Sequence, residues 1–313
     1  MNKKKWPLFF ISLIGIIVLL LIVLNVLRFA SLASAPQPVT TSLALATNTA
    51  TATPTPSPTS TVTPLPTETP LPTATPEING SLIIIGYSVQ NRPLEVYQFG
   101  TGEHHLMILA GIHGGYEANT VALVDELIAR LKDKEISGPA DVTLYVLRNL
   151  NPDGYAKQLG PDGRANADNV DLNRNWDANW QAKWSGTQCW SLRFITAGKS
   201  PFSEPETKAL ADFLLTNKVQ ALIDYHSAAL GLFAGSGLAQ KQSGQLAYQL
   251  SLVSPYSYPP VNSDCQYTGQ MIDWASAQGI AAVDLELRTH TDTDLAINLK
   301  VMDVFLDWKR YLN

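Results

Sequence analysis

The sequence predicts an α/β fold in which helices cover both faces of a central mixed, largely parallel sheet, giving three layers. Two observations carry this prediction. After residue 77, short apolar runs alternate with amphipathic segments, and several of the runs are apolar on both faces, as is typical of central strands. Residues 78–313 are also numerous enough to bury a sizeable core. We therefore expect one folded domain over this range.

Residues 1–35 are predicted to form a cytoplasmic stub and a transmembrane signal-anchor. Residues 8–27 are nearly all apolar, and twenty residues at about 1.5 Å each match the roughly 30 Å core of a bilayer. Three lysines precede this segment and only Arg28 follows it, which favours a single-pass protein with its folded part outside the cytoplasm. The alternative is a cleavable signal peptide, because Ala33-Ser34-Ala35 resembles a cleavage site, and the protein would then be secreted.

Residues 36–77 are predicted to be a disordered linker. Ten of the 20 prolines and 14 threonines lie between Pro36 and Pro76, with almost no charge. Such a stretch cannot bury enough apolar surface to offset the entropy of folding, and its prolines favour a semi-extended chain. The segment would hold the folded domain away from the membrane.

Charge and cysteine content exclude several partners and sites. Residues 78–313 carry 18 basic and 25 acidic residues, and no basic run follows residue 5, which argues against nucleic acid. Two cysteines are too few for a disulfide framework or a cysteine-rich zinc site. One bridge between Cys189 and Cys265 is favoured over two free thiols if the domain lies in an oxidising compartment. We expect a monomer.

The secondary structure follows from the apolar pattern along the chain. The strands are short, largely apolar runs, and the helices place apolar residues at i, i+3 and i+4. In chain order we predict strands at 81–86 and 106–110, a helix at 117–132, a strand at 142–147, a helix at 203–216, a strand at 219–225, helices at 241–252 and 270–278, a strand at 280–287 and a helix at 294–311. Because ligands bind at the carboxyl ends of strands in such sheets, the residues at those ends are the first candidates for a site.

Three of these strand ends carry potential zinc ligands. His113 and Glu117 follow the second strand, His226 follows the fourth, and Glu286 lies near the end of the fifth. Two imidazoles and a carboxylate form a three-ligand set that leaves one zinc position open for water, and a further carboxylate could take a proton from that water. A structural role is the usual alternative for a single histidine, but the joint occurrence predicts a hydrolytic site with one Zn²⁺ per chain.

The segment between residues 151 and 177 offers guanidinium and amide groups on loops after a buried strand. Planar, forked donors such as Arg164 and Arg174 can hold a carboxylate or stabilise an oxyanion. The alternative is that NPDG forms a turn and the rest a solvated loop.

From about residue 80 to its end, the chain resembles the zinc carboxypeptidases of the M14 type. The resemblance rests on the runs IHGGYE, NPDGYA, RANADNVDLNRNWD, DYHS and DLELR, which stand in the family's order over almost the whole folded part. It implies a zinc carboxypeptidase-like fold and water attack on the C-terminal peptide bond of a substrate with a free carboxylate. The implied zinc ligands are His113, Glu117 and His226.

The resemblance also implies roles for the remaining candidates. Glu286 would act as general base and acid, Arg164 would polarise the scissile carbonyl, and Asn173 with Arg174 would grip the terminal carboxylate. The sequence departs from the family in two places. The covering tyrosine is matched only loosely, and Glu117 stands four residues after His113 where the family's spacing is three. The extra residue lies in a glycine turn that can absorb it.

Three positions bear on the substrate. Tyr267 stands nearest to the place of the family's covering tyrosine. Asp284 precedes Glu286 by two residues on one strand, so both point toward the same pocket, where a carboxylate would favour an amine-bearing side chain; a structural hydrogen bond is the alternative. Ile272 matches a pocket-floor position and favours an apolar lining instead.

The sequence therefore predicts a membrane-tethered, extracytoplasmic zinc metallocarboxypeptidase. One alternative keeps the site but acts as a zinc-dependent amidase on cell-wall peptides or acyl-amino acids. Another is a tethered binding module without activity, which the presence of Glu286 disfavours. His290, just past Glu286, could line the site, whereas His104 and His105 are expected to be exposed and to have no role in it. The tryptophans of residues 176–190 are expected to pack against the core, although they could stack on the sugar rings of a glycan.

Overall fold

The computed structural model describes residues 79–183, 195–228, 230–262 and 265–308, all of which belong to one compact unit, Pro70–Asn313. The predicted membrane segment, the linker, Cys189, Trp184 and Trp190 lie outside the described residues. Among the helices of the described part, none is long and apolar enough to cross a membrane.

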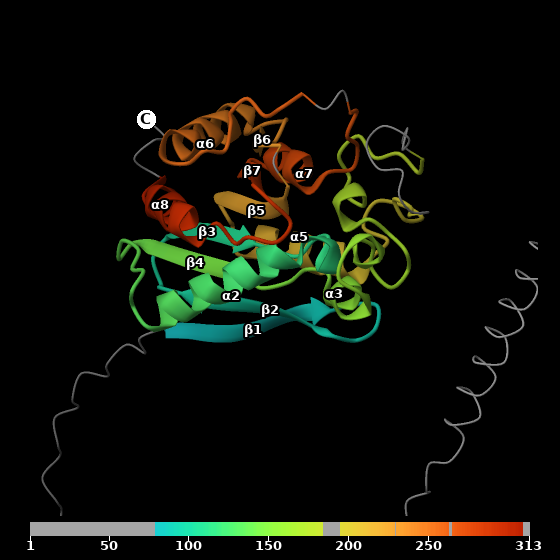
Figure 1. The fold of residues 1–313 in the computed structure, drawn as a ribbon, viewed down its shortest axis with the longest axis horizontal. Coiled ribbons are helices and arrows are strands. Elements are labelled where there is room, and N and C mark those ends of the chain that lie inside the picture. Colours follow the sequence, from blue (N-terminus) through green and yellow to red (C-terminus); the bar gives the residue numbers. More distant parts are fainter. Residues whose placement is uncertain (1–78, 184–194, 229, 263–264, 309–313) are drawn as a thin grey trace, which may run out of the picture. The chain divides into compact units, whose positions relative to one another are not determined.

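A seven-stranded mixed sheet forms the centre of this unit, running from β1 at the bottom to β6 at the top of Figure 1. Its order is β1-β2-β4-β3-β5-β7-β6. The four central strands, β4, β3, β5 and β7, are parallel, whereas β1, β2 and β6 pair antiparallel at the two edges. The strands are β1 Asn79–Tyr87, β2 Pro93–Phe99, β3 His104–Leu109, β4 Val142–Leu147, β5 Ala221–Ser227, β6 Leu232–Ala234 and β7 Ala281–Leu287. The sheet is therefore mixed, as predicted, and its parallel strands form the centre.

Helices lie on both faces of the sheet, which gives the predicted three layers. One apolar cluster joins α2, α6 and α8 to one face, and a second joins α5 and α7 to the other. The helices are α2 Ala118–Lys132, α3 Pro152–Lys157, α5 Pro205–Thr216, α6 Gln240–Val253, α7 Met271–Ala277 and α8 Leu295–Leu306. Three single 3₁₀ turns, η1 Gly114–Glu117, η2 Pro161–Gly163 and η3 Leu172–Arg174, lie in the loops.

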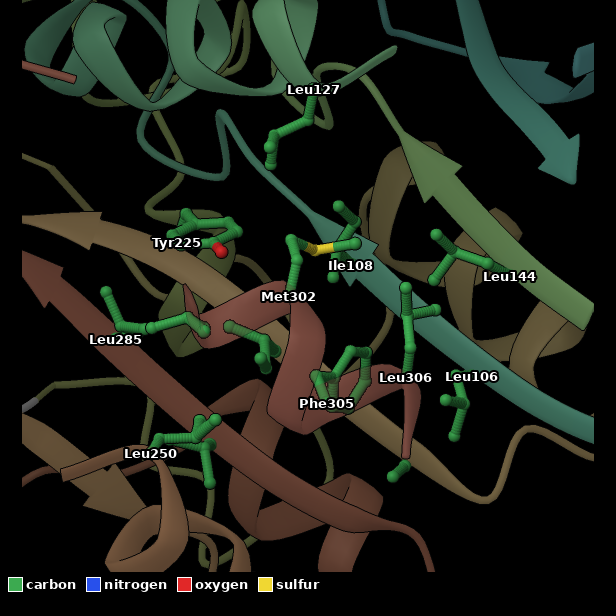
Figure 2. Packing of buried hydrophobic residues seen from close by; sticks show 14 of the residues in the cluster. Leu106, Ile108, Leu127, Leu144, Tyr225, Leu250, Leu285, Met302, Phe305 and Leu306 are labelled. Carbon is green, nitrogen blue, oxygen red and sulfur yellow. The ribbon is translucent and has the colours of Figure 1, made fainter. Parts of the chain in front are cut away.

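The first of these clusters forms the larger core. Met302 and Phe305 of α8 are fully buried and pack with alternate residues of β3 and β7, including Ile108 and Leu285 (Figure 2). Truncating a buried phenylalanine of this kind to alanine costs about 3–5 kcal/mol. The core thus fixes β5 and β7, the two strands that carry functional candidates.

Several elements differ from the sequence-based prediction. Strands β2 and β6 were not predicted, since β2 carries Glu95 and Gln98 among its apolar residues and β6 has only three residues. The NPDG run starts a short helix, α3, rather than a simple turn, because Asn151 caps it by accepting a hydrogen bond from Gly154 N at 2.8 Å. The last helix ends at Leu306 rather than near residue 311.

Candidate active site

A cavity of about 210 Å³ opens at the carboxyl ends of β3, β5 and β7. It is smaller than the roughly 300–1,000 Å³ clefts that hold drug-sized ligands. Nine of the ten site residues predicted from the sequence line it, and the lining also includes Tyr116, Ser227, Phe233 and His290. The nine are His113, Glu117, Arg164, Asn173, Arg174, His226, Tyr267, Asp284 and Glu286.

The three predicted zinc ligands converge in this cavity. His113 Nδ1 lies 2.8 Å from Glu117 Oε1, and His226 Nδ1 lies 3.1 Å from Glu117 Oε2. All three side chains are buried, and each offers a donor atom within 4.8 Å of the others. Two imidazole nitrogens and one carboxylate are a donor set suited to zinc.

Two further carboxylates lie beside the outer nitrogens of the histidines. Asp224 Oδ2 lies 3.1 Å from His226 Nε2, and Asp171 Oδ1 lies 3.3 Å from His113 Nε2. A carboxylate behind a metal-binding histidine fixes the ring and its tautomer, which leaves Nδ1 of each ring for the metal. No role for Asp171 or Asp224 was predicted, although Asp224 precedes His226 by two residues on one strand and so faces the same side.

The electrostatic surroundings favour a positive charge at the triad. Burial lowers the pKa of an imidazole, yet Asp224, Asp284 and Glu117 raise the pKa of His226 well above its usual value. Burial likewise raises the pKa of a carboxyl group, but His113 and His226 hold the pKa of Glu117 below its usual range. A divalent cation would meet an ionised carboxylate here, so the residues present fit a zinc ion.

Glu286 lies beside the triad on the neighbouring strand. It is paired in register with His226 across β5 and β7, and its Oε2 atom is buried without a hydrogen-bond partner among the described residues. Burial, followed by the negative charges of Glu117 and Asp284, raises the pKa of Glu286 to about 8. A carboxylate with such a pKa can accept and return a proton near neutral pH.

The predicted cationic and amide groups line the same cavity. Arg164 Nη1 lies 3.7 Å from Glu117 Oε1, while Arg164 Nε and Nη2 lie 3.0 and 2.9 Å from Asp171 Oδ2. The Asn173 amide is held by Met271 N, which donates to its Oδ1 at 2.9 Å, and Arg174 Nη1 donates to Asn173 O at 2.6 Å. Arg164 is therefore anchored with its guanidinium beside the ligand triad, and Arg174 is anchored in the same cavity.

Glycines let the metal-ligand loop, residues 111–117, pack backbone to backbone against the loops that carry Arg164. A Cβ atom at Gly115 or Gly163 would overlap the carbonyl oxygen of Gln158, and one at Gly114 would lie 2.7 Å from Gly163 O. Gly114 also adopts a φ of +45°, which disfavours other residues. The turn between His113 and Glu117 thus absorbs the additional residue between these two ligands.

The remaining predictions have mixed outcomes. Tyr267 lies with its ring 5.3 Å from the Arg174 guanidinium, and His290 contacts Tyr116 with 4.7 Å between ring centroids. Ile272 is a correction, because it is 2 % exposed within the core cluster of α5 and α7 and does not line the cavity. Its place on the inner face of α7 turns the side chain into the core. His104 and His105, which were expected to be exposed, are half-buried on β3.

Two further predictions, on the tryptophans and on the cysteines, concern residues outside the cavity. Trp176 is fully buried against Phe202 and Trp274, as expected for packing rather than sugar stacking. Cys265 is disulfide-bonded, and Cys189, the only other cysteine of the sequence, lies outside the described residues.

Comparisons with known proteins agree with this geometry. The family model described as "Zinc carboxypeptidase" matches residues 73–303. Carboxypeptidase A2 of Mus musculus is 29% identical over 232 residues, covering 64% of this chain and 55% of the relative. Murein peptide amidase A of Escherichia coli K12 is 31% identical over 164 residues, covering 49% of this chain and 61% of the relative.

Among solved structures, bovine thrombin-activatable fibrinolysis inhibitor in complex with tick carboxypeptidase inhibitor has a similar fold, with a TM-score of 0.62 and 22% identity over 74% of this chain and 90% of that one. The chain spans a little over half the length of the two curated relatives. Because the family model matches most of the chain, including every residue of the cavity, the chain belongs to the zinc carboxypeptidase family.

Proposed function

We propose that this protein is a zinc metallocarboxypeptidase that hydrolyses the C-terminal peptide bond of its substrates. One observation carries the proposal: Glu286, with an unpaired buried oxygen, lies in the same cavity as the His113–Glu117–His226 triad. A proton acceptor beside a metal-binding triad is the arrangement that hydrolysis of an amide by water requires.

Zinc, when held by the triad, would supply Lewis-acid polarisation of the scissile carbonyl and would lower the pKa of water. The protein's own residues would transfer the protons and stabilise the developing negative charge. Glu286 would take a proton from the attacking water and return it to the leaving amine, and the Arg164 guanidinium would stabilise the oxygen on which negative charge develops. Asp171 keeps Arg164 in place, because its Oδ2 accepts a hydrogen bond from Nε and forms an ion pair with Nη2.

Asn173 and Arg174 favour a carboxypeptidase over an amidase. Arg174 and Asn173 both line the cavity, and planar donors such as a guanidinium match the two oxygens of a free carboxylate. The second candidate, an amidase acting on cell-wall peptides, is favoured by the likeness to murein peptide amidase A. Both candidates use the same triad and the same Glu286.

We also propose that the domain acts outside the cytoplasm and is tethered to the membrane. The support is the apolar segment at residues 8–27, the lysines before it and the Thr/Pro-rich stretch after it. A fusion reporter at each end of the chain, read by protease accessibility in intact cells, tests this topology.

The test of activity uses the full chain, purified in detergent with its zinc content measured. We expect close to one zinc per chain and release of the last residue from peptides with a free C-terminus, but little release from the same peptides when C-terminally amidated. Glu286→Gln should lower kcat by about 10²- to 10⁴-fold with zinc retained. The matched control is Glu103→Gln, whose side chain is 84% exposed. Unchanged turnover in Glu286→Gln would end the proposal, and equal turnover of amidated peptides would favour the amidase.

A further inference from the structure

We propose that Asn166 is a positioning residue which, anchored on two buried carboxyl groups, holds Arg164 where it stabilises the developing negative charge. The proposal rests on the proposed function, in which Arg164 acts on the oxygen of the scissile carbonyl. It follows from the hydrogen bonds of the Asn166 side chain, from the burial of its partners and from its place in the chain between Arg164 and Asp171.

The amide oxygen of Asn166 closes a short loop. Its Oδ1 accepts hydrogen bonds from Asp168 N at 3.1 Å and from Val170 N at 3.0 Å, and Asn166 N donates to Val170 O at 3.0 Å. Asparagine side chains commonly bind the backbone of turns in this way. The loop begins two residues after Arg164 and ends one residue before Asp171, and the side chains of these two residues bind each other. Asn166 therefore fixes the path of the chain between Arg164 and its carboxylate partner.

The amide nitrogen of Asn166 anchors this loop to the start of α5. Its Nδ2 donates to Glu204 Oε2 at 2.7 Å and to Glu206 Oε2 at 3.3 Å, and all three side chains are buried. The other oxygens of the two carboxyl groups accept from Ser203 Oγ at 2.7 Å and from Val89 N at 3.1 Å. Because a buried carboxyl group needs hydrogen-bond donors, Asn166 is bound firmly at this point.

Asn166 acts through Arg164 and does not itself line the cavity. Arg164 is a lining residue, and its Nη1 lies 3.7 Å from Glu117 Oε1, whereas Asn166 is not among the lining residues. The main chain at Arg164 is held on one side by Asn151 Nδ2, which donates to Arg164 O at 3.0 Å, and on the other side by the Asn166 loop. Loss of the second hold lets the guanidinium shift, and a displacement of about 1 Å in an active site can lower a rate by about 10²-fold.

The experiment is a double-mutant cycle on the full-length holoenzyme, measured as kcat and KM on a peptide with a free C-terminus. Asn166→Ala should lower kcat by about 10- to 100-fold, with KM and zinc content unchanged. Arg164→Ala should lower kcat by about 10²- to 10³-fold, and adding Asn166→Ala to it should lower kcat by less than about threefold further, because the positioned group is already absent. The matched control is Asn298→Ala, which removes a buried amide that donates to Tyr256 Oη rather than to α5 and should leave kcat unchanged.

A second pair of variants covers the case in which Asn166→Ala does not fold. Glu204→Ala removes the nearer anchor and should lower kcat by about tenfold. Glu204→Gln keeps an oxygen for Asn166 and gains an amide that can donate to Ser203 Oγ, so it should retain most of the wild-type kcat.

The outcomes separate the positioning role from the proposed function. Equal losses of kcat from Asn166→Ala in the wild-type and Arg164→Ala backgrounds, or equal losses in Glu204→Ala and Glu204→Gln, overturn the positioning role and leave the proposed function intact. A folded Asn166→Ala variant with wild-type kcat has the same meaning. Absence of cleavage by the zinc-loaded wild-type chain instead removes the proposed function, and the positioning role with it.

Discussion

Replacing Asp171 with asparagine tests whether the outer carboxylates control the metal site. Asp171 is fully buried and accepts hydrogen bonds from Arg164 Nε on Oδ2 and from Asn173 N on Oδ1. Arg164 Nη2 lies 2.9 Å from Oδ2 and His113 Nε2 lies 3.3 Å from Oδ1. Burial would raise the pKa of Asp171, but Arg164 and His113 hold it well below the usual range, so the group is ionised. Asparagine has one acceptor oxygen and cannot serve both sides.

Either orientation of the asparagine leaves donors facing donors. If its oxygen faces Arg164, the amide nitrogen faces His113 and Asn173, and the His113 ring loses its anionic partner. Loss of such a partner weakens metal binding by about 10- to 100-fold, which corresponds to roughly 1.4–2.8 kcal/mol. If the oxygen faces His113, the buried Arg164 charge loses its pair, which costs about 3–5 kcal/mol of folding stability. We therefore expect weaker zinc binding, lower stability, or both.

The assay is zinc competition with a chelator of known affinity, together with urea unfolding of the metal-free chain. Asp212→Asn is the matched control, because its side chain is 66% exposed and pairs only with Lys208 in the described structure. A folded Asp171→Asn variant whose zinc affinity is within threefold of wild type and whose unfolding free energy is unchanged would refute the reasoning. The histidine would then be oriented by its packing alone.

Three further predictions follow from the geometry. Burial, reinforced by Glu204, raises the pKa of Glu206 to about 7, so its folded carboxyl keeps a proton that the unfolded chain loses above about pH 4.5. The contribution of Glu206 to the free energy of unfolding should be fully present below pH 4.5 and fall by up to about 3 kcal/mol as the pH rises to 7. Urea unfolding across pH 5–8 measures this fall, which Glu206→Gln should remove. The control Glu103→Gln, at an exposed position, should show the same fall as wild type. Chelation of zinc should lower the midpoint of thermal unfolding by about 5–10 °C, because a saturating ligand contributes roughly 3 kcal/mol to stability. Adding zinc back should restore the midpoint. An unchanged midpoint in protein shown to be metal-free would contradict the predicted metal site. Gly115→Ala should lower the unfolding free energy by about 1–3 kcal/mol and weaken zinc binding, because its methyl group overlaps Gln158 O; wild-type values for both would show that the loops can separate.

The residues that line the cavity were largely predictable because several of them stand at strand ends. His226 and Glu286 could be placed together since parallel strands end at the same edge of a sheet, and the structure pairs them in register. Arg164 and Arg174 were recognisable from their motif, and both line the cavity. Zinc as the metal followed from the ligand types.

The parts that could not be predicted depend on contacts between distant segments. Strand β2 alternates imperfectly because it lies near the edge, so its pattern was too weak to identify. Ile272 was assigned to the pocket from its motif, but only the packing of α7 shows that it turns into the core. Asp171 shows no periodic pattern, and its importance appears only when Arg164 and His113 are seen on either side of it.

The close approach of the metal-ligand loop to the Arg164 loop has a consequence for interpreting mutational scans. Gly114, Gly115, Gly154 and Gly163 carry no reactive group, yet a methyl group on any of them would meet backbone atoms of the facing segment. A survey that ranks positions by intolerance to substitution should score these four as high as the predicted zinc ligands. Separating the two classes requires comparing substitution at the glycines with substitution at Glu286, where a carboxamide is sterically harmless and only the chemistry is lost.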